Sequence, residues 1–240
     1  MKNDFSGGSA YYDVILGKKT FAKHAAFVAK ILKQHKVKTV LELGCGSGLY
    51  LAPLKKQRFD IHGLDISAPM LKHAKKIKGV RVFQKDMTTF KLPQKYDAIL
   101  VLNSGLVLLP NAKAIQKTIN NVQRHLNPGG LFLIDIPNHA VEIKENNNTT
   151  GKHAYKIPKG KLEVVFEDHK RGNKWVADWY GYVNGKKDFH EHYEELIVDP
   201  KTMERMFKGF NILSVHGTRS GGRFDPKKSY RRFYVLNLAN

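Results

Sequence analysis

Short apolar runs alternate with longer amphipathic segments along the first half of the chain, a pattern typical of a parallel sheet covered by helices. The apolar runs predict strands at 39–43, 60–65, 80–84, 96–101 and 131–135. The amphipathic segments predict helices at 20–35, 49–55, 68–77 and 111–126. We therefore expect a doubly wound α/β fold.

The pattern changes after residue 137. Residues 145–151 are polar and predict a loop. Stretches rich in aromatic and β-branched residues predict an antiparallel β-meander at 162–168, 175–183 and 189–198. A helix is expected at 200–208, and two strands at 211–217 and 232–238. These last strands are expected to form an antiparallel hairpin that closes a mostly parallel sheet of seven strands.

The change of pattern also divides the chain. Its 240 residues are enough for one large domain or for one domain with an insertion. We expect a main, ligand-binding domain at 1–137 and 199–240. The antiparallel region at 138–198 is expected to be inserted into it and to cap the substrate.

A tight turn follows the first predicted strand. That strand ends at Glu42 and Leu43, and the turn contains Gly44, Gly46 and Gly48. Glycine has no Cβ, so a ligand can approach the backbone closely. Cys45 lies inside the turn, where a small side chain fits, and we interpret it as a packing residue. Such turns also serve folding alone, so the ligand interpretation depends on residues further along the chain.

Two acids follow the next two predicted strands. Asp65 is placed where an acid reaches the ribose hydroxyls of an adenosine ligand. A helix N-cap is the alternative role, but Ser67 can serve as the cap. Asp86 suits an adenine amino group, with Met87 as an apolar neighbour. The glycine spacing lacks the third small residue of the dinucleotide fingerprint, so a mononucleoside fits better.

Composition limits the possible partners and locations. The net charge is +20, but the basic residues are mainly scattered lysines, so a nucleic-acid partner is less favoured than a small molecule. The single cysteine excludes an internal disulfide framework. No apolar run reaches the roughly 20 residues of a membrane span, and the N-terminus lacks the apolar core of a signal peptide. We expect a cytoplasmic monomer or homodimer.

These motifs resemble those of the class I S-adenosylmethionine-dependent methyltransferases. The resemblance covers approximately residues 10–137 and is found at 40–48, 63–71, 86–87 and 96–99. It implies that S-adenosylmethionine is the cofactor. By position in the motifs, Glu42 and the Gly44–Gly48 turn with Cys45 would contact the methionine part of the cofactor, and Asp65 would contact the ribose. Ile66, Asp86 and Met87 would contact the adenine. Asn103 and Ser104 would lie near the methyl group and the substrate.

A narrower resemblance is to small-molecule N-methyltransferases, including those that dimethylate amino groups of nucleotide-linked deoxysugars. It rests on the segment around Tyr12, on the predicted meander and on the late segment that contains Arg223. It implies that Tyr12 contacts the cofactor and that Arg223 lies near a substrate phosphate. The chain departs from this group at Phe5 and Phe21, where tyrosines are expected, and at 107–108, where a histidine is expected.

Methyl transfer from a sulfonium needs alignment and a dry pocket more than a strong base. His139, just beyond the fifth predicted strand, is the candidate base and substrate contact, with a solvated loop histidine as the alternative. His190, His192 and Glu194 share one face of a predicted strand, but a polar outer face is favoured there over a metal site, and no metal is expected.

Arginine and lysine gather near the C-terminal end, where we expect Arg223 and its neighbours to favour an anionic substrate. An exposed, charged edge is an equally good interpretation. The members of this basic cluster are Arg219, Arg223, Lys227, Lys228, Arg231 and Arg232.

Three functions stay open on the sequence. The first is methylation of a small molecule, with N-methylation of an amine favoured. The second is methylation of RNA or protein, which the net charge favours. The third is binding of S-adenosylmethionine without catalysis, and the acids at 42, 65 and 86 argue against it.

Overall fold

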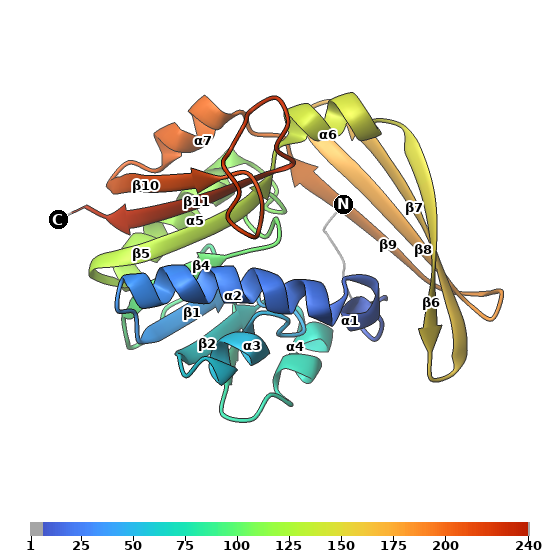
Figure 1. Ribbon diagram of the computed structural model, residues 1–240, viewed down its shortest axis with the longest axis horizontal. Coiled ribbons are helices and arrows are strands. Elements are labelled where there is room, and N and C mark those ends of the chain that lie inside the picture. Colours follow the sequence, from blue (N-terminus) through green and yellow to red (C-terminus); the bar gives the residue numbers. More distant parts are fainter. Residues whose placement is uncertain (1–6, 240) are drawn as a thin grey trace.

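Two β-sheets organise the protein, whose computed structural model describes residues 7–239 (Figure 1). The larger sheet has seven strands in the order β10-β11-β5-β4-β1-β2-β3. Its strands are β1 (Thr39–Leu43), β2 (Asp60–Asp65), β3 (Arg81–Gln84), β4 (Tyr96–Val101), β5 (Leu126–Pro137), β10 (Phe210–His216) and β11 (Arg231–Leu238). β1 to β5 pair in parallel, whereas β11 is antiparallel to both β5 and β10. The predicted fold class, with its closing antiparallel hairpin, is confirmed.

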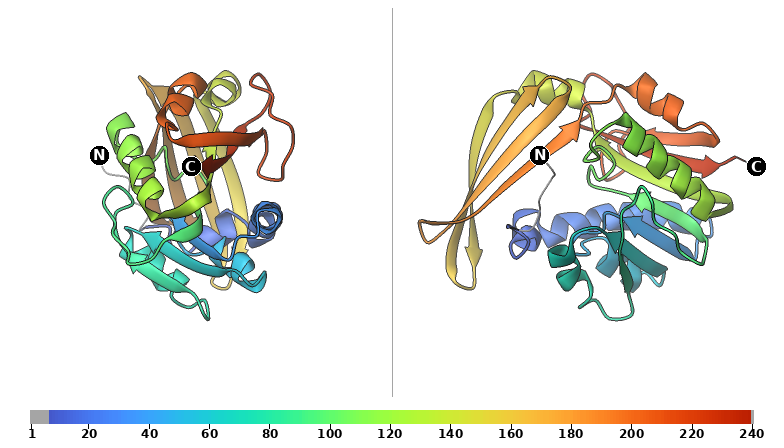
Figure 2. Two further views of the ribbon diagram at one scale, coloured as in Figure 1. Left: turned by 90° about the vertical axis from the view of Figure 1, so that its left-hand side faces the viewer. Right: turned by 180° about the vertical axis from the view of Figure 1, so that it is seen from behind.

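Helices cover both faces of the larger sheet (Figure 2). One face packs against α2 (Lys18–Gln34), α3 (Leu51–Lys56) and α4 (Ala68–Ala74), and the other against α5 (Ala112–His125) and α7 (Pro200–Met206). Apolar side chains from both layers bury the central strands completely, including Leu41 and Ile99. Burial on both faces explains why these strands are continuous apolar runs in the sequence. Among the described residues, every helix is too short or too polar to cross a membrane.

The smaller sheet, which we call the cap sheet, has four antiparallel strands in the order β6-β7-β8-β9. Its strands are β6 (Thr149–Ile157), β7 (Gly160–Arg171), β8 (Lys174–Val183) and β9 (Lys186–Leu196). A helix, α6 (His139–Asn146), joins it to β5. Figure 1 shows the cap sheet standing beside the larger sheet, with α6 between them at one end.

The prediction of a loop at 145–151 is wrong, because α6 continues to Asn146 and β6 begins at Thr149. The inserted region therefore has four strands where three were expected. β6 is an edge strand, and only Ile157 in it is buried. An exposed edge strand needs no apolar face, so its sequence resembles a polar loop.

The first described residues lie between the two sheets. The short helix α1 (Tyr12–Ile15) places the Tyr12 ring 6.2 Å from that of Trp179, and the neighbouring Tyr11 ring stacks on Phe189 at 5.7 Å. Phe5, noted in the sequence, lies outside the described residues. The N-terminal segment thus links the cap sheet to the larger sheet.

Candidate active site

The turn after β1 folds around its glycines. Gly44, Gly46 and Gly48 have φ of 69°, 52° and 91°, a backbone region that side chains with a Cβ disfavour. The N–H groups of Gly44 and Cys45 both donate to the carbonyl of Leu64, at 2.7 and 3.1 Å. A Cβ on Gly48 would lie 2.4 Å from Ile77 Cδ1. The backbone conformation therefore favours glycine at all three positions, and the buried Cys45 fills the interior of the turn.

Asp65 ties this turn to the helix that follows β2. Its Oδ2 accepts from the backbone N–H of Gly46 at 2.7 Å, and its Oδ1 accepts from that of Ser67 at 2.8 Å. Burial raises the pKa of Asp65, and the backbone hydrogen bonds offset part of that effect. Ser67 itself caps α4 by accepting from the N–H of Met70. A carboxylate has further lone pairs, so Asp65 can hold the turn and still accept from a ribose hydroxyl.

Glu42 is the most deeply buried acid at this turn. Its side chain is only 3% exposed, and its Oε2 has no hydrogen-bond partner among the described residues. Burial, and secondly the charge of Asp65, raise the pKa of Glu42 well above its usual range. A buried carboxylate without a partner is costly. A ligand ammonium group, such as that of the methionine part of S-adenosylmethionine, would satisfy it.

The residues assigned to the adenine lie near the same turn. Ile66 follows Asp65 and is 53% exposed, which leaves an apolar surface uncovered. The Met87 Cε atom would be 3.3 Å from a Cβ on Gly44, so Met87 borders the turn. Asp86 is exposed, and its Oδ1 accepts from the N–H and the hydroxyl of Thr88, both at 2.7 Å. An apolar surface flanked by acids fits an adenosine, and these residues together fit S-adenosylmethionine.

Tyr12 closes the site from the N-terminal side. Ser47 in the turn donates to Asp13 Oδ1 at 3.0 Å, which anchors α1 on the turn. On the cap side, the N–H of Gly8 donates to Glu191 Oε1 at 2.8 Å. Burial, and then the charge of Glu191 and a hydrogen bond with it, raise the pKa of Tyr12 well above its usual range. The N-terminal segment is therefore held at both ends across the turn.

A buried ion cluster, which we call the Asp135 cluster, lies at the end of β5. Asp135 is fully buried and accepts from Arg219 Nε at 2.7 Å and from Arg231 Nε at 2.9 Å. The same guanidinium groups donate to Asn103 Oδ1 at 2.8 Å and Ser104 Oγ at 3.2 Å. Burial alone would raise the pKa of Asp135, but the two guanidinium charges outweigh it and hold that pKa well below its usual range.

The Asp135 cluster fixes the loop after β4. Asn103 and Ser104 have φ of 51° and 68°, which is unfavourable for residues other than glycine. Their N–H groups donate to Asp135, to Oδ2 at 3.1 Å and to its backbone carbonyl at 2.9 Å. The sequence placed both residues at the substrate side but did not indicate Asp135. An acid at the carboxyl end of a central parallel strand is the signal that points to it.

A cavity of about 310 Å³ opens between the Asp135 cluster and the cap sheet. On one side it is lined by Tyr12, Asn103 and Ser104 with Arg219 and Arg231. Three carboxylates line it on the other side, and we call them the carboxylate trio: Glu142 of α6, Asp168 of β7 and Glu195 of β9. The cavity walls also contain three aromatic side chains of the cap sheet, Trp175, Trp179 and Tyr193.

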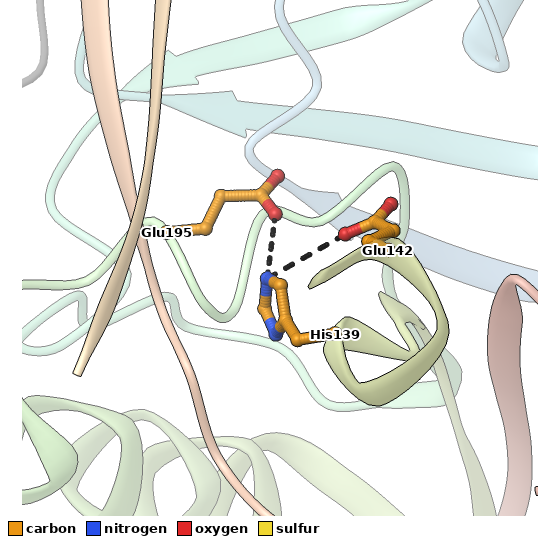
Figure 3. Close-up of side chains that lie close together, drawn as sticks. All are labelled: His139, Glu142 and Glu195. Carbon is orange, nitrogen blue, oxygen red and sulfur yellow. Dashed lines mark hydrogen bonds and ion pairs between the residues drawn. The ribbon is translucent and has the colours of Figure 1, made fainter. Parts of the chain in front are cut away.

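His139 lies behind the trio and is not among the residues that line the cavity. It is 2% exposed, and its Nε2 lies 3.1 Å from Glu195 Oε2 and 3.9 Å from Glu142 Oε2 (Figure 3). The alternative of a solvated loop histidine is therefore wrong, because α6 buries this side chain. His139 reaches the cavity only through the two carboxylates.

The remaining candidates lie away from the cavity. Arg223 is exposed and pairs with His216 in an isolated β-bridge. Arg232 of the same basic cluster is buried instead, and it donates to the carbonyl of Val198 at 2.7 Å. His190 and His192 both bond to Asp178 Oδ1, at 2.7 and 2.9 Å, on the outer face of the cap sheet.

Glu194 pairs with Arg171 and Lys174, and its Oε1 also lies 3.7 Å from His192 Nε2. The outer face of the cap sheet is thus polar and internally paired.

The strand order and the glycine turn agree with a known domain family. Residues 40–130 match the methyltransferase domain family. The fold as a whole is that of solved S-adenosylmethionine-dependent methyltransferases.

Its relatives include enzymes that act on amino sugars. The dTDP-3-amino-3,4,6-trideoxy-alpha-D-glucopyranose N,N-dimethyltransferase of Streptomyces venezuelae is 29% identical over 129 residues, which cover 52% of this chain and 54% of that protein. The chain thus spans about half the length of the curated relatives it matches.

Solved structures resemble the whole fold. An S-adenosylmethionine-dependent methyltransferase from Clostridium acetobutylicum superposes with a TM-score of 0.80 at 19% identity, over 96% of this chain and 97% of that one. An amino pentose methyltransferase from Micromonospora echinaspora gives 0.74 at 21% identity, over 91% and 92% of the two chains. At these identities the likeness shows a common fold that includes the cap sheet.

Proposed function

We propose that this protein methylates an amine nitrogen of a small molecule, with S-adenosylmethionine as the methyl donor. The observation that carries the proposal is the cavity of about 310 Å³ between the Asp135 cluster and the cap sheet, because its size suits a small ligand. The named activity of the Streptomyces venezuelae relative, an N,N-dimethyltransferase, supports an amine as the acceptor.

The residues form two neighbouring sites, one for the cofactor and one for the acceptor. Glu42, Asp65 and the backbone of the glycine turn would hold the cofactor, and Ile66 with Met87 would pack on its base. When bound, S-adenosylmethionine supplies a methyl group on a sulfonium, so that the carbon–sulfur bond breaks, and its electrons return to sulfur, as the acceptor nitrogen bonds to carbon. The protein's contribution is to align the acceptor and to exclude water. Tyr12 and the loop of Asn103 and Ser104 lie where both sites meet.

The cavity favours a cationic acceptor over the anionic one that the sequence suggested. Its two guanidinium groups, of Arg219 and Arg231, are already bonded to Asp135, whereas within residues 7–239 no guanidinium or ammonium group is bonded to the carboxylate trio. Arg223 is exposed and outside the lining residues, so an anionic portion of the substrate would meet it only beyond the cavity.

Calorimetric titration of S-adenosylmethionine tests the proposed cofactor site. We expect Glu42→Gln to weaken binding about tenfold or more, because it removes the charge facing the ligand ammonium, as in other charge-assisted pairs. Glu163→Gln is the matched control, since Glu163 lies on the cap sheet and pairs with the exposed Lys152 and Lys161. Equal affinity in the wild type and the Glu42 variant, or no binding at all, would contradict the proposal.

A further inference from the structure

The carboxylate trio has more negative charge than its surroundings balance. Glu142 and Glu195 are held close together by His139, whose Nε2 lies 3.1 Å from one and 3.9 Å from the other. Asp168 comes from the neighbouring strand and lines the same cavity. The nearest guanidinium groups belong to the Asp135 cluster and are bonded there. A cation entering the cavity would therefore meet three carboxylates.

Aromatic rings surround the same space. In the cap sheet, Trp175 lies directly opposite Glu195, and Ala177 lies between Asp168 and Tyr193. Side chains at these paired positions point to the same face of a sheet, toward the cavity. Rings combined with carboxylates form the typical environment of an ammonium group, because the ring faces attract cations as well.

The trio also attracts protons. Burial, and then the charge of Glu195, raise the pKa of Glu142 to about 7. The same two causes raise the pKa of Asp168 to about 6. Coupled groups in one site titrate together, so a proton held near neutral pH belongs to Glu142 and Asp168 as a pair. Glu142 lines the cavity, and its buried Oε2 lies 3.9 Å from His139 Nε2 without a hydrogen-bond partner among the described residues.

We infer that Asp168 and Glu195 bind the acceptor as an ammonium ion and that Glu142 takes its proton before the methyl group is transferred. The inference rests on the proposed function and names the acceptor class: an aliphatic amine, protonated at neutral pH. In this step an N–H bond breaks and an O–H bond forms on Glu142, while the electron pair stays on nitrogen as the lone pair that attacks. The proton then leaves Glu142 for water, and the methylated nitrogen is again a cation.

A metal ion is the competing occupant of this cluster. The ligand atoms of His139, Glu142 and Glu195 all lie within 4.8 Å of one another. A histidine that binds a metal almost always donates its other ring N–H to a partner, which fixes its orientation. The Nδ1 of His139 has no hydrogen-bond partner within the described part of the chain. His139 therefore fits better as a positioning residue that holds the carboxylates.

Two probes of equal size test the ammonium site: cyclohexylamine, which is a cation at neutral pH, and cyclohexanol, which is not. We expect the amine to bind at least about tenfold more tightly in calorimetric or NMR titrations at millimolar concentrations. Asp168→Asn and Glu195→Gln should each weaken amine binding about tenfold, whereas the control Glu163→Gln should leave it unchanged. Two separate variants are made so that the test still stands if one of them does not fold. Thermal unfolding shows whether each variant is folded.

The role of Glu142 is tested by the pH dependence of cyclohexylamine methylation. In the wild type the rate should rise as pH passes through about 7, where Glu142 ionises. Glu142→Gln should keep amine binding within about threefold but lose this rise and most of the rate. A rise that persists in the variant would overturn the role of Glu142.

The outcomes separate the two proposals. A protein that binds S-adenosylmethionine but binds both probes equally, or neither, would overturn the ammonium site and leave the proposed cofactor intact. Stoichiometric binding of Zn²⁺ that displaces the amine would also overturn it, in favour of a metal. Failure to bind S-adenosylmethionine would instead contradict the proposed function itself.

Discussion

Two groups of buried charge face each other across the cavity, and they show opposite electrostatics. In the Asp135 cluster, one carboxylate is bonded to two guanidinium groups, and its pKa is held low. In the carboxylate trio, the carboxylates lie near one another, and the pKa values of Glu142 and Asp168 are raised. Burial opposes ionisation in both places, and the guanidinium charges reverse its effect only in the Asp135 cluster.

This difference in charge balance indicates that the Asp135 cluster supports the fold, whereas the carboxylate trio binds a ligand. A balanced cluster has its partners within the fold, and here it holds the strained loop of Asn103 and Ser104 in place. An unbalanced cluster retains the capacity to bind a cation from outside. We therefore expect substitutions in the Asp135 cluster to change stability first, and substitutions in the trio to change binding and pH dependence.

The largest effect is expected for Asp135→Asn. This change leaves two partly buried guanidinium groups without an anion, and breaking a buried pair typically costs about 3 kcal/mol or more of unfolding free energy. Urea denaturation measures the loss. Glu194→Gln is the matched control, because Glu194 also lies between two cations, but its partner Arg171 is 56% exposed. Equal losses in both variants would show that the Asp135 cluster has no special structural role.

The second-largest effect concerns how the free energy of unfolding depends on pH. The folded pKa of Glu142, about 7, lies above its ordinary value of 4.5, so the folded state binds more protons than the unfolded state between these values. Stability should therefore fall as pH rises from about 4.5 to 7, by on the order of 3 kcal/mol from this group. Asp135 has the opposite shift, so its contribution is lost only as pH falls below its ordinary value of 3.8.

Denaturation curves at several pH values measure whether stability falls as pH rises from 4.5 to 7. The charged and titratable groups that face Glu142 are Glu195, Asp168, Arg231, Arg219, His139 and Tyr193. Glu142→Gln should flatten the fall between pH 4.5 and 7. A smaller slope should remain, because the raised pKa of Asp168 acts in the same direction. An unchanged slope would mean that Glu142 is not the group that responds.

The sequence predicted the two sheets unequally, and burial explains why. β1 and β4 begin and end where the apolar runs do, because strands covered on both faces need apolar side chains throughout. β6 was missed because it is an exposed edge strand of mostly polar residues. The boundaries of α3 and α7 differ from the predictions by one or two residues, which is usual for helix ends.

The same contrast holds for the candidate site. The residues around the cofactor turn, from Glu42 to Asp65, lie close together in the sequence, so their spacing could be read directly. Asp135 meets Arg219 and Arg231 across 84 and 96 residues, which no local pattern encodes. The trio joins three separate elements, α6, β7 and β9, whose members lie far apart in the sequence. Long-range pairing of this kind needs the folded structure.

The smallest effect on stability is expected for a conservative substitution within the Asp135 cluster. Arg219→Lys keeps the charge but removes the planar group that bonds to Asp135 and Asn103 together. We expect a loss of about 1 kcal/mol of unfolding free energy. A double-mutant cycle with Asp135→Asn measures the coupling, since the lysine substitution should cost less once the carboxylate has lost its charge. Strict additivity would mean that Arg219 stabilises the fold through Asn103 alone, and the loop would then be held independently of Asp135.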